Sequence, residues 1–140
     1  MTYSTAQAAR LAGCTASQLR HWSRNGLVVP SDDTRYTFRD LVALRIVRSL
    51  LDAGLPSARV RAAVETLRQM GDADLASLRL VTDGRTVFAC HDDGQILDAL
   101  RHGQLAFFIA VDQLAAAVEI DVATFEHERD EFVERIRQVP

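Results

Sequence analysis

The sequence contains only two cysteines and no uninterrupted apolar run long enough to cross a bilayer. Cys14 and Cys90 lie far apart, which indicates no disulfide framework and suits a reducing compartment. The first ten residues, MTYSTAQAAR, lack the basic and then apolar pattern of an export signal. These absences predict a cytoplasmic protein, associated with the nucleoid if it binds DNA, and no membrane partner.

Lysine is absent altogether from the 140 residues, so every one of the 16 basic residues is an arginine. Arginine favours planar, bidentate contacts to phosphate, but biased codon composition explains the same absence. The hydrophobic and charged fractions, 48% and 25%, are ordinary for a soluble globular protein and argue against disorder. The length fits one domain or two small ones.

The charged residues are unevenly distributed along the chain. Through Met70 there are ten arginines and five acidic residues, and beyond it six arginines and fourteen acidic residues. A basic first half joined to an acidic second half predicts a polyanionic partner for the first and a different task for the second. Chance segregation of surface charge is the alternative explanation.

Two capping-box patterns mark helix starts near the N-terminus. Ser4 with Gln7, and Thr15 with Gln18, have the spacing at which each side chain satisfies a backbone N–H of the first helical turn. We therefore expect a helix over residues 5–12, a turn at Gly13, and a second helix from about residue 15 to the Asn-Gly pair that follows Arg24. Two short helices joined by a tight turn predict a helix-turn-helix.

The rest of the first half predicts a small hairpin and two longer helices. Residues 27–36, LVVPSDDTRY, have the β-favouring ends and polar turn of a hairpin. Apolar residues recur at helical spacing over residues 39–53, after a looser cap formed by Thr37 and Asp40, and again over residues 56–70, with Pro56 suited to the first turn.

Beyond residues 71–77, a predicted boundary, the pattern changes to short strands and helices. Asp83-Gly84 predicts a two-residue turn between the strands LRLVT and RTVFAC. We further expect a turn at 91–94, a short helix at 96–100 closed by Gly103, a buried strand at 105–111 and an amphipathic helix at 122–137. The predicted fold is a mainly α N-terminal winged helix-turn-helix domain, residues 1–70, plus a small α+β C-terminal module, residues 75–140.

No constellation of catalytic residues stands out. The sequence has no Gly-rich phosphate loop, no Ser/His/Asp set and no paired carboxylates with the logic of an acid and a base. Cys90-His91-Asp92-Asp93 contains metal-ligand types, but adjacent residues in a turn rarely converge on one ion, and no second Cys/His pair has zinc-like spacing. We expect no enzymatic activity, no metal and no cofactor.

Two stretches of the first half resemble the MerR family of bacterial winged-helix regulators. They are AARLAGCTASQLRHWSRNGLV at residues 8–28 and RYTFRDLVALRIVRSLLDAGL at residues 35–55, and the likeness covers about residues 3–70. Several elements of the family pattern recur in order: a helix, a Gly turn, a polar recognition helix, Gly-Leu, a wing closing on Arg-Tyr, and a long helix.

The sequence also departs from the family pattern. His21 stands where an aromatic ring is usual, Ser23 replaces a common Glu or Gln, and Thr34 stands where a second arginine often precedes Arg35-Tyr36. The long dimerisation helix of the family normally follows the fourth helix directly, whereas here a hairpin module intervenes. The usual antiparallel dimer therefore does not follow from the resemblance.

The resemblance implies that the second helix enters the major groove of duplex DNA with its N-terminal residues near base edges. Leu19 would anchor this helix to the first one. Trp22 has two interpretations, a core residue or a ring packed on the wing with its indole N–H toward a phosphate. Tyr36 either contacts phosphate or caps an edge of the core. The predicted DNA-binding residues are Thr15, Ser17, Gln18, Arg20, His21, Trp22, Arg24, Arg35 and Tyr36.

Three functions remain open at this point. The resemblance implies a sequence-specific transcriptional regulator that binds two-fold sites on double-stranded DNA as a homodimer. An antitoxin-like or adaptor protein would use its acidic C-terminal module to bind a partner protein while the N-terminal domain autoregulates. An architectural binder would hold DNA without sequence preference. The C-terminal module has three open roles: dimerisation, binding of a small effector, and binding of a partner protein.

Overall fold

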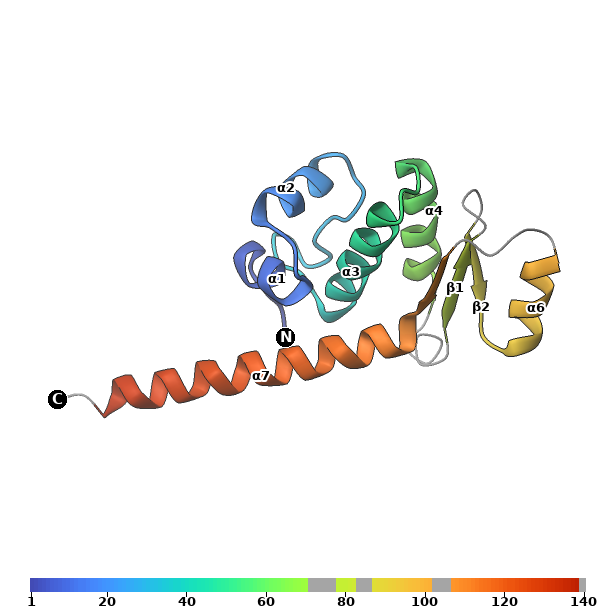
Figure 1. Ribbon diagram of the computed structural model, residues 1–140. Helices are drawn as coiled ribbons and strands as arrows, with labels where there is room; N and C mark the ends of the chain where they lie inside the picture. The colour runs from blue at the N-terminus through green and yellow to red at the C-terminus, as the bar shows by residue number, and fades with distance from the viewer. Residues whose placement is uncertain (71–77, 83–86, 102–106, 139–140) are drawn as a thin grey trace.

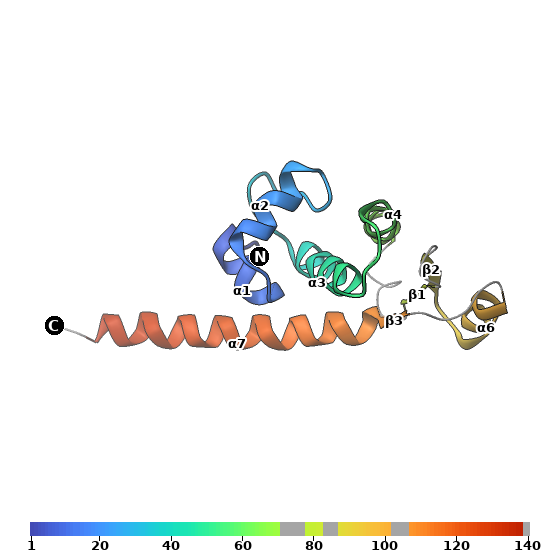
Figure 2. The same cartoon turned by 45° about the horizontal axis from the view of Figure 1, so that its top comes forward.

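The computed structural model describes residues 1–70, 78–82, 87–101 and 107–138 (Figure 1). Four helices of the first half form a cluster, a three-stranded sheet lies beside it, and a long final helix runs along α1 and α3 and extends past them (Figures 1 and 2). The elements are α1 Thr5–Ala12, α2 Ala16–Arg24, α3 Phe38–Asp52, α4 Ser57–Arg68, β1 Arg79–Thr82, β2 Val87–Cys90, α6 Asp93–Arg101, β3 Phe107–Ala110 and α7 Val111–Arg137.

The helix-turn-helix forms where local sequence signals predict it. Gln7 N–H donates to the Ser4 hydroxyl at 3.3 Å and Gln18 N–H to the Thr15 hydroxyl at 3.1 Å, and each Gln side chain accepts the N–H of its cap residue. Gly13 adopts the left-handed conformation, with φ 71°, between the two helices. The predicted limits of α1 and α2 are confirmed within a residue because these signals are local.

At Gly13 the backbone disfavours any other residue, and the tip of the Arg48 side chain occupies the space that a Cβ would take. A Cβ there would lie 2.5 Å from Nη1 of Arg48, which donates to the Gly13 carbonyl at 2.6 Å. We expect Gly13→Ala to lower the free energy of unfolding by ~1–2 kcal/mol from the left-handed backbone alone, with a further loss from displacing Arg48. Urea denaturation measures the change. Gly54→Ala is the matched control, because Gly54 also has positive φ but open space around it; equal losses for the two variants would contradict the role of Arg48.

The loop of residues 27–36, called the wing below, is not the two-stranded hairpin that the sequence predicts. Its strands reduce to one bridge, between Asp32 and Arg35. At the start of the wing, the N–H groups of Leu27 and Val28 donate back to the Trp22 carbonyl at 2.8 and 3.3 Å, which keeps both residues at the end of α2 and buried. The returning segment pairs with the N-terminus instead, which a local pattern cannot reveal.

One buried carboxylate holds the middle of the wing and the residue that follows it. Asp40, in the first turn of α3, accepts hydrogen bonds from the N–H and hydroxyl of Ser31 at 2.9 and 2.5 Å and from Thr37 N–H at 2.8 Å. It is 5% exposed. The predicted cap between Thr37 and Asp40 is therefore confirmed. The Asp40 carboxylate also positions the wing through Ser31, which the sequence did not indicate.

Helix α3 is buried more completely than a single amphipathic face predicts. It packs against α1, α4 and α7, so apolar residues are covered on several sides: Leu41, Val42, Ala43, Leu44, Ile46, Val47 and Leu50. α4 begins at Ser57, with Pro56 as its cap residue rather than within its first turn. It buries Val60, Val64 and Leu67, which lie at the helical spacing predicted for residues 56–70.

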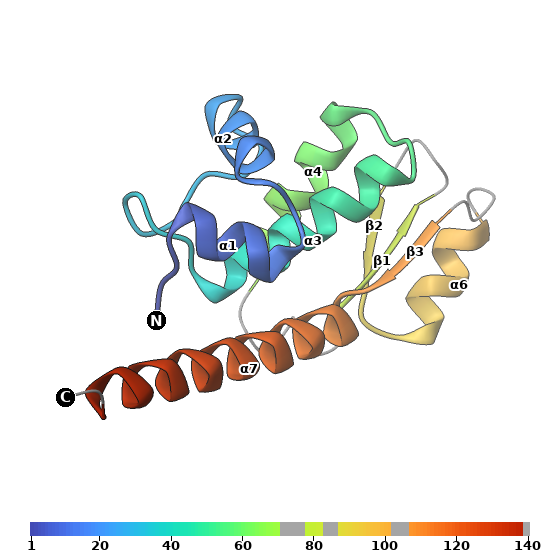
Figure 3. The same ribbon diagram turned by 60° about the vertical axis from the view of Figure 1, so that its left-hand side comes forward.

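The sheet is antiparallel in the order β2-β1-β3, with α6 on one side and α4 and α7 on the other (Figure 3). Leu80 pairs with Ala89 and Ile109 and joins the main core, whereas Val81 and Cys90 join a small second cluster with Ala99 of α6. This alternation is the two-residue period of a strand. The predicted pairing of the two strands is confirmed; Asp83-Gly84, Gly103 and residues 71–77 lie outside the described residues.

Two boundaries in the second half differ from prediction. The turn expected at 91–94 is wrong in its last two positions, since α6 begins at Asp93; Asp92 accepts Gln95 N–H at 2.8 Å and caps this helix. The last helix begins at Val111 rather than near residue 122 and has 27 residues. Val111 and Val118 are both buried, so the part of this helix next to β3 belongs to the core. Within the described ranges no helix has the length and apolarity that a membrane span needs.

Candidate nucleic-acid interface

Helix α2 is held by one face and exposes the others. Leu19 and Trp22, three residues apart, are 0% and 5% exposed and fix the helix to the core. The sequence predicts one anchor, and the structure contains two. The residues that α2 and its cap expose are Thr15, Ser17, Gln18, Arg20, His21 and Arg24.

Trp22 is a core residue, which is the first of its two predicted interpretations. Its ring lies in the main apolar cluster, and its carbonyl accepts the N–H groups that begin the wing. A ring that is 95% covered is not free to lie along a phosphate backbone. Trp22 therefore positions α2 and the wing relative to each other, and we do not include it among the proposed DNA contacts.

Tyr36 is likewise in the core, with 1% of its surface exposed. Its N–H and carbonyl both pair with the backbone of Tyr3 at 2.8 Å. Burial, with a further contribution from Asp40, raises the pKa of the Tyr36 hydroxyl, so this group stays protonated and able to donate. The ring of Tyr36 lies among core residues, and contact of its hydroxyl with a phosphate stays a prediction.

A hollow of about 380 Å³ separates α2 from the wing. Arg20 and Arg24 line it from α2, Pro30 and Thr34 line it from the wing, and Tyr36 lies at its base. The Asp33 carboxylate also lines it and opposes an anion there. Two guanidiniums around an open hollow of this size suit an anionic group such as a phosphate of a nucleic-acid backbone.

Some arginines of the first half are committed, meaning that the guanidinium has a hydrogen-bond or ion-pair partner within the fold, and others are uncommitted. Arg39 donates to the carbonyls of Leu67 and Met70, Arg48 to Gly13, and Arg61 to Asn25. Arg10 pairs with Glu128, and Arg45 with Asp121. Among the described residues, by contrast, the guanidiniums of Arg20 and Arg24 on α2 make no hydrogen bond or ion pair, and the same is true of Arg59 and Arg68 on α4.

Two further arginines bear on the interface. Arg35 is exposed in the wing, but its Nε and Nη2 donate to the hydroxyl and carbonyl of Thr2 at 2.8 and 3.2 Å. Arg61, an exposed residue of α4, donates to the Asn25 carbonyl at 2.9 Å and holds the C-terminal end of α2. Helical spacing indicates that Arg61 is exposed, but contains no signal for a contact between distant segments.

The N-terminal end of α2 has no compensating negative charge. Its first turn contains no acidic residue, and its last turn contains His21 and Arg24. The backbone N–H groups and dipole of a helix N-terminus favour anions. The exposed N-terminal turn, with the hydroxyl of Ser17 and the amide of Gln18, is therefore suited to lie in a negatively charged groove.

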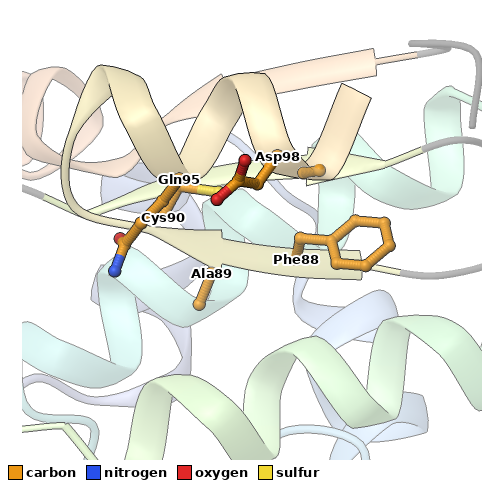
Figure 4. Close-up of a pocket in the computed structure, with 6 residues that line it drawn as sticks. Phe88, Ala89, Cys90, Gln95 and Asp98 are labelled. Atoms are coloured by element: carbon orange, nitrogen blue, oxygen red, sulfur yellow. The ribbon is translucent and has the colours of Figure 1, made fainter. Parts of the chain in front are cut away.

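A second hollow, of about 310 Å³, lies between β2 and α6 (Figure 4). Phe88 and Cys90 of β2 and Gln95 and Asp98 of α6 line it. Burial, with a contribution from Asp92, raises the pKa of the Cys90 thiol, which keeps it protonated. In the described part of the chain, no group of three or more His, Cys, Asp or Glu side chains is placed to hold a metal ion.

Comparison with known families assigns the region that contains these features. A family model, described as MerR HTH family regulatory protein, matches residues 3–67. Residues 3–67 belong to the MerR helix-turn-helix family. The match confirms the resemblance found in the sequence and spans α1 to α4, the wing included.

The curated relatives that this chain matches are regulators by name. It is 38% identical over 135 residues to an uncharacterized HTH-type transcriptional regulator of Mycobacterium bovis, and likewise to one of Mycobacterium tuberculosis. The alignments cover 91% of this chain and 60% of each relative, so the chain spans about 60% of their length. Among solved structures it is similar to HiNmlR, a MerR family regulator lacking the sensor domain, bound to promoter DNA, with TM-score 0.43, 19% identity and coverage of 98% and 89%.

Proposed function

We propose that this protein is a transcriptional regulator that binds two-fold sites on duplex DNA as a dimer, with α2 of each copy in the major groove. The observation that carries the proposal is the division among the arginines. Arg10, Arg39, Arg45 and Arg48 all have partners within the fold. Among the described residues, the arginines of the first half without a partner are Arg20, Arg24, Arg59 and Arg68, and of these Arg20 and Arg24 lie on α2 and line the α2–wing hollow. Uncommitted guanidiniums on a MerR-type recognition helix are available for phosphates.

In the proposed complex the N-terminal turn of α2 reads bases. Ser17 is exposed, and its hydroxyl is available to a base edge. The Gln18 carbonyl oxygen accepts Thr15 N–H at 2.9 Å, so its amide NH2 is the part that remains for DNA. A donor alone fits the acceptors O6 and N7 of guanine, O4 of thymine or N7 of adenine, but it cannot make the bidentate contact to N6 and N7 of adenine.

We therefore expect Gln18→Glu to change DNA recognition without unfolding the helix. A carboxylate still accepts Thr15 N–H and preserves the capping box, but it brings negative charge and no donor to the base edge. Affinity for the preferred duplex should fall by about tenfold or more, while the melting temperature stays near that of the wild type. Gln7→Glu, the same change in the capping box of α1, is the matched control. Unchanged affinity and base preference in Gln18→Glu would contradict base reading by this residue.

The dimer is proposed from an apolar stripe on α7 that is interrupted once, at Arg129. Residues spaced alternately by three and four include Val118, Val122 and Phe125, which pack against the body of the protein, and Phe132 and Ile136, which are 57% and 55% exposed. The stripe thus continues beyond the surface that covers its first part, along the stretch that extends past α1 (Figure 2). A repeat of this spacing is typical of a coiled-coil seam.

The charges of the same stretch favour an antiparallel partner of identical sequence. Its first half contains four carboxylates and one arginine, Arg129, and its end contains two arginines and one carboxylate, Glu134, so the two parts keep opposite net charges. The four carboxylates are Glu126, Glu128, Asp130 and Glu131, and the two arginines are Arg135 and Arg137. Antiparallel pairing of two copies places each acidic half against a basic end, whereas parallel pairing places like charges together. A second copy is therefore the occupant we propose for the exposed part of α7, which yields the two-fold symmetry of a dimeric DNA binder.

Sequencing of the DNA fragments that the purified protein retains from fragmented genomic DNA tests the proposal. A regulator of the proposed kind enriches fragments that share a two-fold motif, since specific binding exceeds nonspecific binding by roughly 10³-fold or more. Retention of all fragments in proportion to their abundance would favour an architectural DNA binder instead.

A further inference from the structure

The N-terminal segment lies between two parts of the molecule that are distant in sequence. The backbone of Tyr3 pairs with Tyr36 at the end of the wing, with both N–H to carbonyl distances 2.8 Å. Arg35 of the wing donates twice to Thr2. The wing is therefore fastened at its C-terminal end to residues 2 and 3 rather than to a second strand of its own.

The side chain of Tyr3 points away from the wing and toward α7. Its ring is 3% exposed and meets Phe125 edge to face, with centroids 6.4 Å apart and an interplanar angle of 70°. Burial raises the pKa of the Tyr3 hydroxyl, Glu126 raises it further, and Arg129 lowers it in part. Glu126 and Arg129 both belong to α7, which agrees with a position of the hydroxyl beside that helix. One residue thus holds the wing by its backbone and α7 by its ring.

Phe125 is itself held from a second side. The Arg10 guanidinium lies 5.9 Å from the centre of its ring, and Arg10 also pairs with Glu128 at 3.1 Å, one helical turn further along α7. Arg45 pairs with Asp121, one turn earlier. Three consecutive turns of α7 are therefore fastened to α1, α3 and Tyr3, immediately before the exposed part of the apolar stripe begins.

We propose that Tyr3 is a positioning residue that couples the wing to α7, so that the geometry of a dimer formed through α7 is transmitted to the two wings. The expected effect on DNA binding rests on the proposed function. The coupling between the wing and α7 in the free protein does not depend on that function. Loss of the ring of Tyr3 or of Phe125 separates the two parts and leaves the backbone pair between Tyr3 and Tyr36 without support from α7.

Hydrogen exchange in the full chain without DNA tests the coupling. Phe125→Ala should speed exchange of the Tyr3 and Tyr36 amides by about tenfold relative to the amide of Leu44 in the core of α3, a scale set by the loss of a buried aromatic contact. Ile120→Ala, on the outer face of the same helix where Ile120 is 66% exposed, should leave the ratio unchanged. Equal ratios in Phe125→Ala and the wild type would overturn the inference.

The consequence for DNA is tested with two-fold duplexes whose half-sites are moved apart by one or two base pairs. Tyr3→Ala should flatten the dependence of affinity on spacing, and Tyr3→Phe, which keeps the ring, should retain it. Leu67→Ala, a core truncation on α4, lowers stability without touching the junction and should retain it too. A wild-type spacing profile in Tyr3→Ala would overturn the inference. Failure of the wild type to bind any two-fold duplex would instead refute the proposed function, leaving the exchange result to decide the coupling.

Discussion

Arg20→Ala should weaken binding to every duplex by about tenfold and lower the slope of log affinity against log salt by roughly one, the signature of one lost phosphate contact. Arg20 is exposed on α2 and lines the hollow beside the wing, and its removal breaks no hydrogen bond or ion pair of the described residues. Because phosphate contacts are independent of sequence, the loss should be the same for preferred and random duplexes. Fluorescence anisotropy over a salt series measures both quantities.

Arg68→Ala provides the control for this result. Arg68 is an exposed arginine at the C-terminal end of α4, the helix that packs against β2, and removing it changes the net charge by the same amount. Affinity and salt slope should stay close to the wild-type values in this variant. Wild-type affinity in Arg20→Ala across the whole series would mean that α2 is not placed against the DNA backbone as proposed.

The double variant Phe132→Glu with Ile136→Glu should convert the dimer to a monomer, which sedimentation equilibrium measures directly. Both side chains lie on the exposed part of the α7 stripe, and two carboxylates there oppose burial against a second copy. Affinity for a two-fold duplex should then fall by about 100-fold, the scale on which linkage of two binding units raises affinity, while binding to a single half-site is unchanged.

Ile120→Glu separates the stripe from general effects of charge on α7. Ile120 is 66% exposed on the opposite face of the same helix, and this variant should remain a dimer with wild-type affinity. A double variant that stays dimeric would contradict pairing through α7. A wild-type protein that is monomeric alone but forms a stoichiometric complex with another protein would favour the adaptor hypothesis.

Local signals account for the parts of the fold that the sequence predicts correctly. The capping boxes at Ser4 and Thr15, and the glycine that joins α1 to α2, act over a few residues, so the limits of both helices can be predicted from the sequence. The helix-turn-helix is specified almost entirely by such signals. The exposed polar face of α2 follows from them as well, since its two apolar residues fix which side is buried.

Tertiary contacts account for what the sequence does not predict. The early start of α7 is an exception, because it has a local signal that the prediction overlooked. Val111, Leu114, Ala115 and Val118 recur at helical spacing, and they face the core. Tyr36 is buried because it pairs with Tyr3, more than thirty residues away. The difference between Arg20 and Arg45, one uncommitted and one bound to Leu11 and Asp121, likewise exists only in the folded chain.

Methylation interference on an enriched duplex tests the placement of α2 most directly. Dimethyl sulfate methylates guanine at N7, which faces the major groove, and adenine at N3, which faces the minor groove. If α2 reads the major groove from both copies of a dimer, methylation of guanines in two symmetry-related half-sites should abolish binding by the wild type. Interference confined to adenines, or to one patch without symmetry, would contradict the account.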